Sequence, residues 1–432
     1  MKVVILNGGK GTRLGLSDRP KPMVPVAGRP LLERLLDVGK ASGFEDYVFL
    51  NGHLAEVIEA HFGDGAGYGV RIRHVREAAP LGTAGAIREA RALLTEPFLV
   101  IYGDILIDVD LAHFAAFHRA RGGIGTLFVH PNDHPQDSDL VEADETGRIR
   151  RFLSKPHAAG AVLPNLVSAA LYVLDPAAIG HVPPQGASDW GHDVFPAIVA
   201  AGGVLHAYRS LEYAKDIGTP DRLARGEADL ASGRVERLSR RQPKPAVFLD
   251  RDGVLNAEIN GVHRPDDLVL LDGAGAALRR INRSGIPAIC VTNQPDVAKG
   301  LVSPEALRQV FAALDTALAR DGAYLDDLYH CPHHPERGWP GEVAALKVDC
   351  ECRKPKPGML LAAARDHNLD LARSWMIGDR YADVVAAQAA GARAVLVRTG
   401  HGGSDRDRHD STPDHVADNL AEAVDYVLRT LA

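Results

Sequence analysis

Short apolar stretches alternate with longer segments of helical pattern along most of this chain, and the alternation restarts once. In the first half, the apolar stretches are residues 3–6, 47–50, 97–104, 125–130 and 169–174. Segments with helical spacing, such as residues 31–43 and 83–94, lie between several of them. This alternation predicts an α/β fold, built on a mainly parallel sheet with crossover helices.

The alternation lapses over residues 233–245, GRVERLSRRQPKP, which are basic, polar and end in two prolines. Such a composition is typical of a linker. A new apolar stretch, AVFLD at 246–250, then restarts the pattern, and further strand candidates follow. A chain of 432 residues also exceeds the size at which one core usually keeps growing. We therefore predict two α/β domains, residues 1–232 and 246–432, joined by residues 233–245.

The composition and charge of the chain exclude several classes of binding partner. The net charge of −7 argues against general affinity for nucleic acid or for an anionic membrane. No apolar run reaches the roughly 18 residues needed to span a bilayer. The opening MKVVILNGGKGTRL reads as a first strand and a glycine turn rather than as a signal peptide. Only four cysteines are present, which favours a reducing cytoplasm where a cysteine cluster binds metal more often than it forms disulfides. Small-molecule substrates are the expected partners, and no oligomeric state is indicated.

Four polar segments of the second half sit at or just beyond the ends of predicted strands, where open α/β sheets place their ligands. They are FLDRDGVLN, VTNQ, CRKPKPGM and IGDRYAD. In-line attack on a phosphomonoester needs a nucleophile, an acid for the leaving oxygen, a metal and a cation. Together the four segments resemble the phosphatases of the haloacid dehalogenase superfamily over residues 246–400.

The resemblance implies a role for each acidic residue. Asp250 would attack phosphorus and form an aspartyl phosphate, and Asp252 would protonate the leaving oxygen and then activate water. Asp250, the backbone carbonyl of Asp252, and Asp379 would bind Mg²⁺. Asp383, four residues after Asp379, would support the metal shell.

The same resemblance implies that three further side chains meet the phosphoryl group. Thr292 and Asn293 would hydrogen-bond it, and Lys354 would neutralise its charge.

The segment CECRKPKPGM places two cysteines directly before a basic run. With the upstream CPHHPE, it offers three thiolates and one imidazole: Cys331, His333, Cys350 and Cys352. This donor set predicts a closed structural zinc site, which would fold a loop and fix Arg353 and Lys354 at the mouth of the phosphatase site. His334 is the alternative to His333, and a disulfide among the three thiols is the alternative to zinc. Cys290 lies in an apolar strand and is expected in the core.

The zinc loop narrows the resemblance to the heptose bisphosphate phosphatases, with the histidinol phosphate phosphatases as close relatives. That branch commonly reads VTNQSGIARG, whereas this chain reads VTNQPDVAKG. Pro295, Asp296 and Lys299 are the departures, and they fall near the expected substrate mouth.

The first half carries its own ordered motifs. They are LNGGKGTRL, PLGTAGAI, YGD ending at Asp104, FLSKP ending at Pro156, and AKDIGTPDRL. A glycine-rich turn between a strand and a helix presents backbone N–H groups to phosphates. In this order the motifs resemble the sugar nucleotidyltransferases over residues 1–230, and within them the enzymes that activate mannose or heptose 1-phosphates. The resemblance implies a Rossmann-like fold here.

In that family, a sugar 1-phosphate attacks the α-phosphorus of a nucleoside triphosphate, and positioning with charge neutralisation supplies most of the rate. The resemblance implies a cradle for the triphosphate made by Gly8, Gly9, Gly11 and Arg13. Lys21 would sit against the α-phosphate, and Gly82 and Thr83 would contact the base. Asp104 and Asp216 would hold Mg²⁺, and Lys155 would bind the sugar phosphate.

Three positions depart from that family's pattern. Asn7 replaces an alanine-like residue, Ser154 replaces a glutamate before Lys-Pro, and Ser168-Ala169-Ala170 replaces Asn-Ala-Gly. The last two positions usually touch the sugar, so they bear on which sugar is accepted.

Two phosphate-handling domains on one chain suggest consecutive reactions. Removal of the 7-phosphate from a heptose 1,7-bisphosphate leaves the sugar 1-phosphate that a nucleotidyltransferase needs. We therefore interpret the chain as a bifunctional enzyme that makes a nucleotide-activated heptose, with GDP-D-glycero-α-D-manno-heptose as the expected product. The alternatives are an N-terminal domain that only binds nucleotide and regulates the phosphatase, or a phosphatase acting on histidinol phosphate.

Overall fold

The computed structural model describes residues 1–9, 11–16 and 18–431. The chain divides into two compact units, the first made of residues 1–130, 138–156 and 166–240. The second unit begins at Arg241 and also takes in residues 131–137 and 157–165, two insertions that the sequence pattern did not indicate. The main change of unit, between Arg240 and Arg241, falls inside the segment predicted as a linker. Part of that segment is helical, as α7 (Arg234–Arg237).

The first unit is built on a nine-stranded sheet with the order β10-β9-β11-β6-β1-β4-β5, extended by β8 beside β11 and β12 beside β8. Its strands are β1 (Val3–Asn7), β4 (Asp46–Asn51), β5 (Arg71–Arg76), β6 (Phe98–Tyr102), β8 (Gly125–His130), β9 (Leu140–Ala143), β10 (Ile149–Leu153), β11 (Val167–Leu174) and β12 (Leu205–Arg209). The neighbours β6, β1, β4 and β5 are parallel, as predicted. By contrast, β11 runs antiparallel to β6, β8 and β9, so the sheet is mixed rather than mainly parallel.

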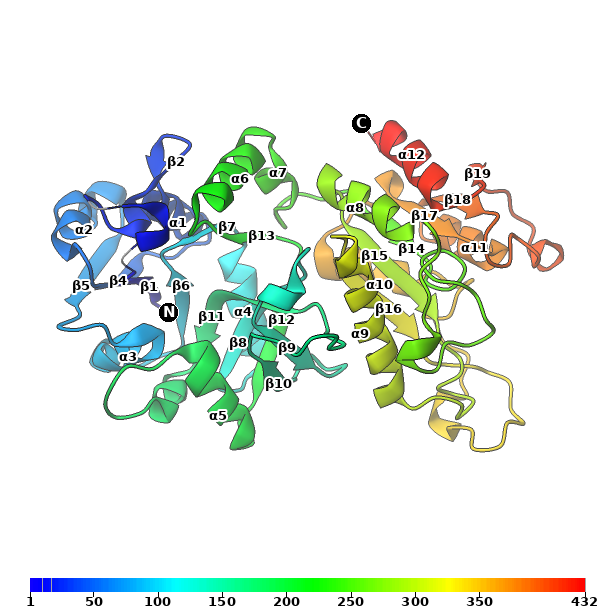
Figure 1. Cartoon of the computed structure of the whole chain (residues 1–432), viewed down its shortest axis with the longest axis horizontal. Helices are drawn as coiled ribbons and strands as arrows, with labels where there is room; N and C mark the ends of the chain where they lie inside the picture. The colour runs from blue at the N-terminus through cyan, green and yellow to red at the C-terminus, as the bar shows by residue number, and fades with distance from the viewer. Residues whose placement is uncertain (10, 17, 432) are drawn as a thin grey trace. The chain divides into compact units, whose positions relative to one another are not determined.

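Helices cover both faces of this sheet, because alternate residues of a strand point to opposite sides. In β1, Val3 and Ile5 join a core formed with α1, α2 and α4, whereas Val4 joins a core formed with α3 and α5. Figure 1 shows these helices around the strands. Besides α7, the helices of the unit are α1 (Leu31–Ala41), α2 (Ala55–Phe62), α3 (Gly82–Glu89), α4 (Leu111–Arg121), α5 (Phe195–Ala200) and α6 (Pro220–Ala231).

A separate two-stranded antiparallel ribbon joins β7 (Ile105–Asp108) to β13 (Tyr213–Asp216). In the register of this ribbon, Asp216 lies opposite Ile105, and Ile105 is the residue that follows Asp104 in the sequence. The ribbon therefore brings together two acidic residues that are more than a hundred positions apart in the sequence. A short hairpin of β2 (Pro25–Val26) and β3 (Arg29–Pro30) completes the unit's strands among the described residues.

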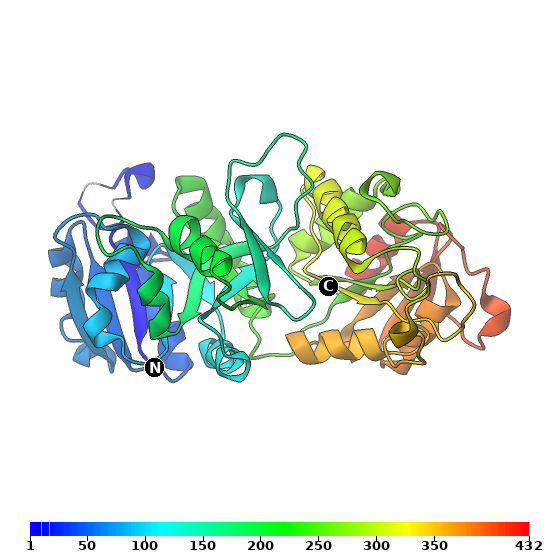
Figure 2. The same ribbon diagram turned by 90° about the horizontal axis from the view of Figure 1, so that it is seen from below.

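The second unit is a six-stranded sheet with the order β16-β15-β14-β17-β18-β19, in which every neighbouring pair is parallel. Its strands are β14 (Val247–Leu249), β15 (Ala288–Asn293), β16 (Asp327–Cys331), β17 (Trp375–Gly378), β18 (Arg393–Val397) and β19 (His415–Ala417). Its helices are α8 (Ala274–Ser284), α9 (Pro304–Arg320), α10 (Gly358–His367), α11 (Tyr381–Ala389) and α12 (Leu420–Leu431). In Figure 2, α9, in yellow-green, and α10, in orange, lie on opposite sides of this sheet.

The carboxyl ends of the central strands β15, β14 and β17 meet at one edge, as parallel pairing requires. Asp250 follows β14, Thr292 and Asn293 end β15, and Asp379 follows β17.

No helix in the described part of the chain combines the length and apolar character needed to cross a membrane.

Candidate functional sites

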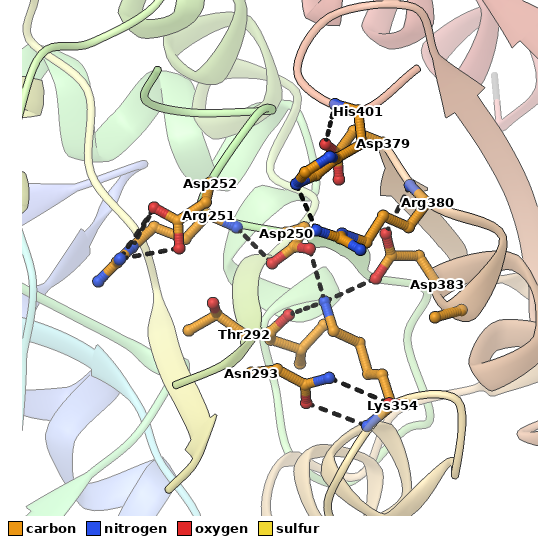
Figure 3. Close-up of polar contacts among 12 residues, drawn as sticks. Asp250, Arg251, Asp252, Thr292, Asn293, Lys354, Asp379, Arg380, Asp383 and His401 are labelled. Atoms are coloured by element: carbon orange, nitrogen blue, oxygen red, sulfur yellow. Dashed lines mark hydrogen bonds and ion pairs between the residues drawn. The ribbon is translucent and has the colours of Figure 1, made fainter. Parts of the chain in front are cut away.

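Three carboxylates gather at the carboxyl edge of the second sheet. Asp250 and Asp379 extend from β14 and β17, and Asp383 lies in the first turn of α11. One oxygen of each lies within 4.8 Å of the others, and all three side chains are buried. Figure 3 shows the carboxylates of Asp250 and Asp383 directed at Lys354, whereas the carboxylate of Asp379 is joined to His401. Carboxylate oxygens are the donors that Mg²⁺ prefers, so the donor set fits the predicted metal.

Lys354 is the cation of this cluster. Its Nζ lies 2.8 Å from Asp250 Oδ2 and 2.6 Å from Asp383 Oδ1, and it donates to the carbonyl of Val291 at 2.8 Å. Burial opposes the charge on Lys354, but the two carboxylates outweigh it and raise the pKa of the ammonium group. Three carboxylates against one ammonium leave a negative excess that a divalent cation would neutralise.

Burial dominates the protonation of the two strand-end carboxyls. It raises the pKa of Asp250 to about 7, although Lys354 acts in the opposite direction. It raises the pKa of Asp379 to about 8, with the charges of Asp250 and Asp383 adding to the effect. In the metal-free protein these groups therefore hold protons that they would release on binding a cation.

This coupling predicts a pH-dependent effect of Mg²⁺ on stability. Because both folded-state pKa values lie above the unfolded value, the folded protein binds more protons, and metal-free stability falls as the pH rises from about 4 towards 8. Thermal unfolding should therefore show a large rise in Tm with Mg²⁺ at about pH 8 and little rise at about pH 5. An equal rise at both values would contradict the predicted competition between protons and metal.

The carboxylate of Asp252 stands apart from this cluster. Arg251 donates to it from Nε at 3.1 Å and from Nη2 at 2.8 Å, and Asn256 and Gln294 donate to it at 2.9 and 3.0 Å. In Figure 3 the Asp252–Arg251 pair lies to the side of Asp250. The sequence analysis missed these three donors, although Arg251 lies between the two aspartates and Gln294 directly follows Asn293.

The two polar residues that end β15 hold neighbouring groups. Asn293 donates to the carbonyl of Lys354 and accepts from its amide N–H, both at 3.0 Å. Thr292 Oγ1 accepts from Gln294 Nε2 at 3.0 Å. The Asn293 amide is thus engaged in positioning Lys354, and its contact with a phosphoryl group stays a prediction.

Backbone groups crowd around Asp379. His401 donates its amide N–H to Asp379 Oδ2 at 2.6 Å. A Cβ on Gly253 or on Gly400 would lie 2.3 Å from the same oxygen, so glycine is required at both positions for the carboxylate to fit. The His401 ring contacts Arg380 and lies 3.3 Å from a carboxylate oxygen of Glu258.

The structure brings together the four ligands that were predicted for zinc. Cys352 Sγ lies 3.2 Å from Cys331 Sγ and 3.2 Å from Cys350 Sγ, and His333 Nδ1 lies 3.2 Å from Cys352 Sγ. The Sγ atoms of Cys331 and Cys350 are 3.5 Å apart. A tetrahedral zinc with Zn–S bonds of about 2.3 Å separates its sulfurs by about 3.8 Å, so these spacings are close to those of a metal shell. A Cys/His cluster of this kind could hold a metal ion.

The two alternatives for this loop find less support. All four cysteines are free thiols, with Cys290 buried in the core as expected. The ring of His334 packs edge-on against Trp339, at 5.0 Å between centroids, and is not part of the cluster. Arg353 follows the cluster directly, and its guanidinium lies 3.4 Å from the carbonyl of His333.

In the first unit, Lys21 lies between the two carboxylates predicted to hold Mg²⁺. Its Nζ is 2.5 Å from Asp104 Oδ2 and 3.7 Å from Asp216 Oδ1. Asp216 also pairs with Arg222 of α6, a residue that the sequence analysis did not single out. Lys21 is buried in a short 3₁₀ turn, Lys21–Met23, that follows the glycine-rich segment. The predicted catalytic lysine and both predicted metal ligands are therefore adjacent.

The glycine-rich segment follows β1, as predicted. Gly11 has a positive φ of 65°, and Arg13 is exposed in the turn Thr12–Leu14. Gly8 is wedged between neighbours: a Cβ there would lie 2.7 Å from Glu77 Oε1, and one on Gly52 would lie 2.9 Å from the Cα of Gly8. Gly9 has open space around it.

The residues predicted to touch the base begin α3. Gly82 has a φ of 73°, and a Cβ on it would lie 2.4 Å from the carbonyl oxygen of Ser188. The hydroxyl of Thr83 donates to Asp189 at 2.7 Å and accepts from the amide of Trp190, so it is engaged within the protein.

The backbone of Lys155, the residue predicted to bind the sugar phosphate, is held in place because its amide N–H donates to Asp139 at 3.1 Å.

Comparison with known proteins gives two separate matches. Residues 2–233 match the family described as nucleotidyl transferase, and residues 351–423 match the one described as HAD-hydrolase-like. The chain is 42% identical over 196 residues to D-glycero-D-manno-heptose-1,7-bisphosphate 7-phosphatase of Thermosynechococcus vestitus, covering 44% of this chain and 98% of that protein. It is also 36% identical over 234 residues to mannose-1-phosphate guanylyltransferase of Mycobacterium tuberculosis. That match covers 53% of this chain and 64% of the other protein. A solved D,D-heptose 1,7-bisphosphate phosphatase from B. bronchiseptica is 32% identical, covers 43% of this chain and 99% of that chain, and has a TM-score of 0.39.

Proposed function

We propose that this chain, which belongs to the nucleotidyl transferase family through its first half and to the HAD-type phosphatases through its second, catalyses two consecutive reactions. The phosphatase site removes the C7 phosphate from D-glycero-D-manno-heptose 1,7-bisphosphate. The transferase site then joins a nucleotidyl group, from GTP, to the heptose 1-phosphate that remains. The observation that carries the proposal is that each half assembles carboxylates around one buried lysine: Lys354 in the phosphatase and Lys21 in the transferase.

In the phosphatase, Asp250 is the nucleophile. Its Oδ1 accepts the amide N–H of Arg251 at 2.7 Å, and its Oδ2 faces Lys354. These contacts fix the carboxylate for in-line attack on phosphorus. The ammonium group of Lys354 neutralises negative charge on the phosphoryl oxygens while the bond between phosphorus and the C7 oxygen breaks. Asp252 gives its proton to the leaving oxygen and afterwards takes one from the water that hydrolyses the aspartyl phosphate.

Two metals accompany this reaction in the proposal. Asp250, Asp379 and the backbone carbonyl of Asp252 would hold Mg²⁺, and Asp383 would support them. The ion would supply positive charge that reduces the repulsion between the phosphoryl group and the attacking carboxylate. Zinc, held by the three thiolates and His333, is structural. It fixes the loop from which Arg353 and Lys354 extend towards the substrate.

In the transferase, the phosphate of the heptose 1-phosphate attacks the α-phosphorus of GTP and releases pyrophosphate. The backbone of the glycine-rich segment and Arg13 hold the triphosphate, and Lys155 binds the sugar phosphate. Lys21 stabilises the charge that develops on the α-phosphate. Asp104 and Asp216 would hold Mg²⁺, which would supply positive charge to offset that of the triphosphate. We place both reactions in the cytoplasm, because the free thiols of the zinc loop need a reducing environment.

A phosphorus NMR time course with heptose 1,7-bisphosphate, GTP and Mg²⁺ tests the proposal. We expect loss of the C7 phosphate signal first, followed by pyrophosphate and a new diphosphate doublet. Release of phosphate with GTP left intact would contradict the transferase assignment for this nucleotide and sugar, and parallel runs with ATP and with the other anomer would identify the cause. Absence of phosphate release would contradict the heptose assignment, and histidinol phosphate would be tried next.

The Asp104→Asn variant separates catalysis from mere nucleotide binding in the first half. The change removes one carboxylate of the proposed metal pair, so pyrophosphate release should slow by about tenfold or more, whereas phosphate release from C7 should be unchanged. Asp110→Asn is the matched control, because the Asp110 carboxylate caps α4 by accepting from the amide of His113 and an asparagine can keep that cap. If Asp104→Asn left pyrophosphate release unchanged, the first half would not use Asp104 in catalysis.

A further inference from the structure

Gln294, the residue directly after β15, contacts two groups of the phosphatase site at once. Its side chain is buried, and its Nε2 donates to Asp252 Oδ2 at 3.0 Å and to Thr292 Oγ1 at 3.0 Å. An amide nitrogen carries two hydrogens, so both bonds can form together. Gln294 therefore links the residue assigned to proton transfer with one that is predicted to contact the phosphoryl group.

The backbone of Gln294 is also held in place. Its amide N–H donates to the carbonyl of Cys331 at 2.8 Å, which continues the parallel pairing of β15 with β16 beyond Asn293 and Cys331. Cys331 is in turn one of the four residues predicted to bind zinc. A side chain that is buried and starts from a fixed backbone position is suited to hold a catalytic group in one orientation.

The carboxylate of Asp252 is held at both oxygens. Oδ1 accepts from Arg251 and Asn256, whereas Oδ2 accepts from Arg251 and Gln294. Arg251 and Asn256 lie one and four positions from Asp252, so they belong to the same turn. Gln294 comes from the strand beside β14 instead. It therefore fixes the carboxylate relative to the edge of the sheet, where Asp250 attacks phosphorus.

The second hydrogen bond of the Gln294 amide orients Thr292. A hydroxyl group has one O–H donor and two acceptor lone pairs. Because Thr292 Oγ1 already accepts from Gln294, one lone pair is occupied and the hydroxyl hydrogen is left to donate elsewhere. A donor at this strand end suits the negatively charged oxygens of a phosphoryl group.

We propose that Gln294 is a positioning residue of the phosphatase reaction, which aligns Asp252 for proton transfer and Thr292 for donation to the phosphoryl group. In the first step, an Asp250 oxygen bonds to phosphorus, the bond from phosphorus to the C7 oxygen breaks, and the Asp252 proton goes to that oxygen. In the second step, water bonds to phosphorus, the bond to Asp250 breaks, and a proton of the water goes to Asp252. Gln294 touches no reacting atom, and the proposal rests on the phosphatase activity of the second half.

Substrates with different leaving groups separate this role from a merely structural one. The C7 oxygen of a sugar leaves poorly as an alkoxide and needs the proton of Asp252, whereas p-nitrophenolate leaves without a proton. Hydrolysis of the aspartyl phosphate also needs Asp252, and it is the same step for every substrate. A misaligned Asp252 therefore slows release of a sugar and hydrolysis of the intermediate, but it does not slow release of p-nitrophenolate.

The Gln294→Met variant tests the proposal, because methionine is of similar length and has no N–H donor. We expect kcat/KM for heptose 1,7-bisphosphate to fall by about 10²-fold, the lower end of what general acid catalysis contributes. For p-nitrophenyl phosphate, kcat/KM should fall by about tenfold or less, the loss expected from Thr292 alone. A burst of about one p-nitrophenolate per chain should precede slow steady-state release, because the aspartyl phosphate accumulates.

Two further variants serve as controls. Thr292→Val removes only the hydroxyl, so the rates with both substrates should fall by a similar factor and without a burst. Gln388→Ala removes an exposed amide of α11 that donates to the carbonyl of Thr412, and it should behave like the unmodified chain. If Gln294→Met does not fold, Gln294→Leu, which also lacks an N–H donor, is measured in its place.

Equal losses with both substrates and no burst in Gln294→Met would overturn the proposal and leave Gln294 a residue that only maintains the strand end. Failure of the proposed function has a different signature: the unmodified chain would release phosphate from p-nitrophenyl phosphate but not from heptose 1,7-bisphosphate. Histidinol phosphate, which also has an alkoxide leaving group, then replaces the heptose, and the same comparison decides the role of Gln294. An unmodified chain that hydrolyses none of these esters would overturn both.

Discussion

The Asp250→Asn variant should lose phosphatase activity by about 10⁴-fold or more, the scale seen when a covalent nucleophile is removed. An amide does not attack phosphorus, and it removes one of the two carboxylates that contact Lys354. The substitution is also nearly isosteric, so it should not unfold the protein. Because burial raises the pKa of Asp250 to about 7, its ionised form is unfavourable in the metal-free fold. In EDTA at about pH 8, the variant should therefore unfold at the same temperature or higher.

Two measurements check this expectation: inorganic phosphate released from heptose 1,7-bisphosphate, and pyrophosphate released from GTP with heptose 1-phosphate supplied. Only the first should change, because Asp250 belongs to the second unit. Asp349→Asn is the matched control, since Asp349 is an exposed carboxylate paired with Lys356 in the same unit. Residual phosphate release above about one per cent would argue that another group is the nucleophile.

The Cys352→Ser variant should lose the bound metal and most of the phosphatase activity. Cys352 is central to the cluster, with two sulfurs and one imidazole nitrogen all 3.2 Å from its Sγ. A structural zinc supplies the folding energy of a loop that has little core of its own. Arg353 and Lys354 follow directly, and a misplacement of a catalytic group by about 1 Å can cost about 10²-fold in rate. We therefore expect zinc content to fall from about one atom per chain towards zero and phosphate release to fall by about 10²-fold or more.

Elemental analysis of the purified protein, together with thermal unfolding, measures this outcome. Cys290→Ala is the control for loss of a thiol, because Cys290 is buried in the core away from the cluster. His333→Ala should lose the metal, whereas His334→Ala should keep it, since His334 packs on Trp339 instead. A Cys352→Ser protein with full zinc content would contradict the assignment of the four ligands, and a disulfide in the unmodified protein would contradict the metal itself.

The sequence analysis identified the members of each cluster more reliably than their contacts. Asp250, Asp379 and Asp383 were expected together because each follows a predicted strand or lies one helical turn beyond it, and they do meet. Asn293 was expected to face a phosphoryl group, but its amide holds the backbone of Lys354, 61 positions later. No local pattern encodes that pairing, because it depends on where the zinc loop returns to β15.

Long-range charge pairs were also beyond the sequence pattern. Sequence motifs identified Lys21, Asp104 and Asp216. Their proximity, however, depends on the β7–β13 ribbon, which brings the two aspartates together. Arg222 and Glu77 carried no motif of their own. Only the tertiary structure places Arg222 beside Asp216 and Glu77 against Gly8. Likewise, the antiparallel direction of β11 was missed, because strand periodicity is the same in both directions.

The amino-acid sequence by itself determined the two α/β halves, the order of their motifs and the residue types of both sites, since periodicity, glycine turns and ligand spacing are local properties. The tertiary structure alone decided which histidine joins the thiols and which carboxylates share a lysine. Those features depend on burial and on contacts between distant strands. Burial in turn sets how strongly Asp250, Asp379 and Glu77 hold their protons.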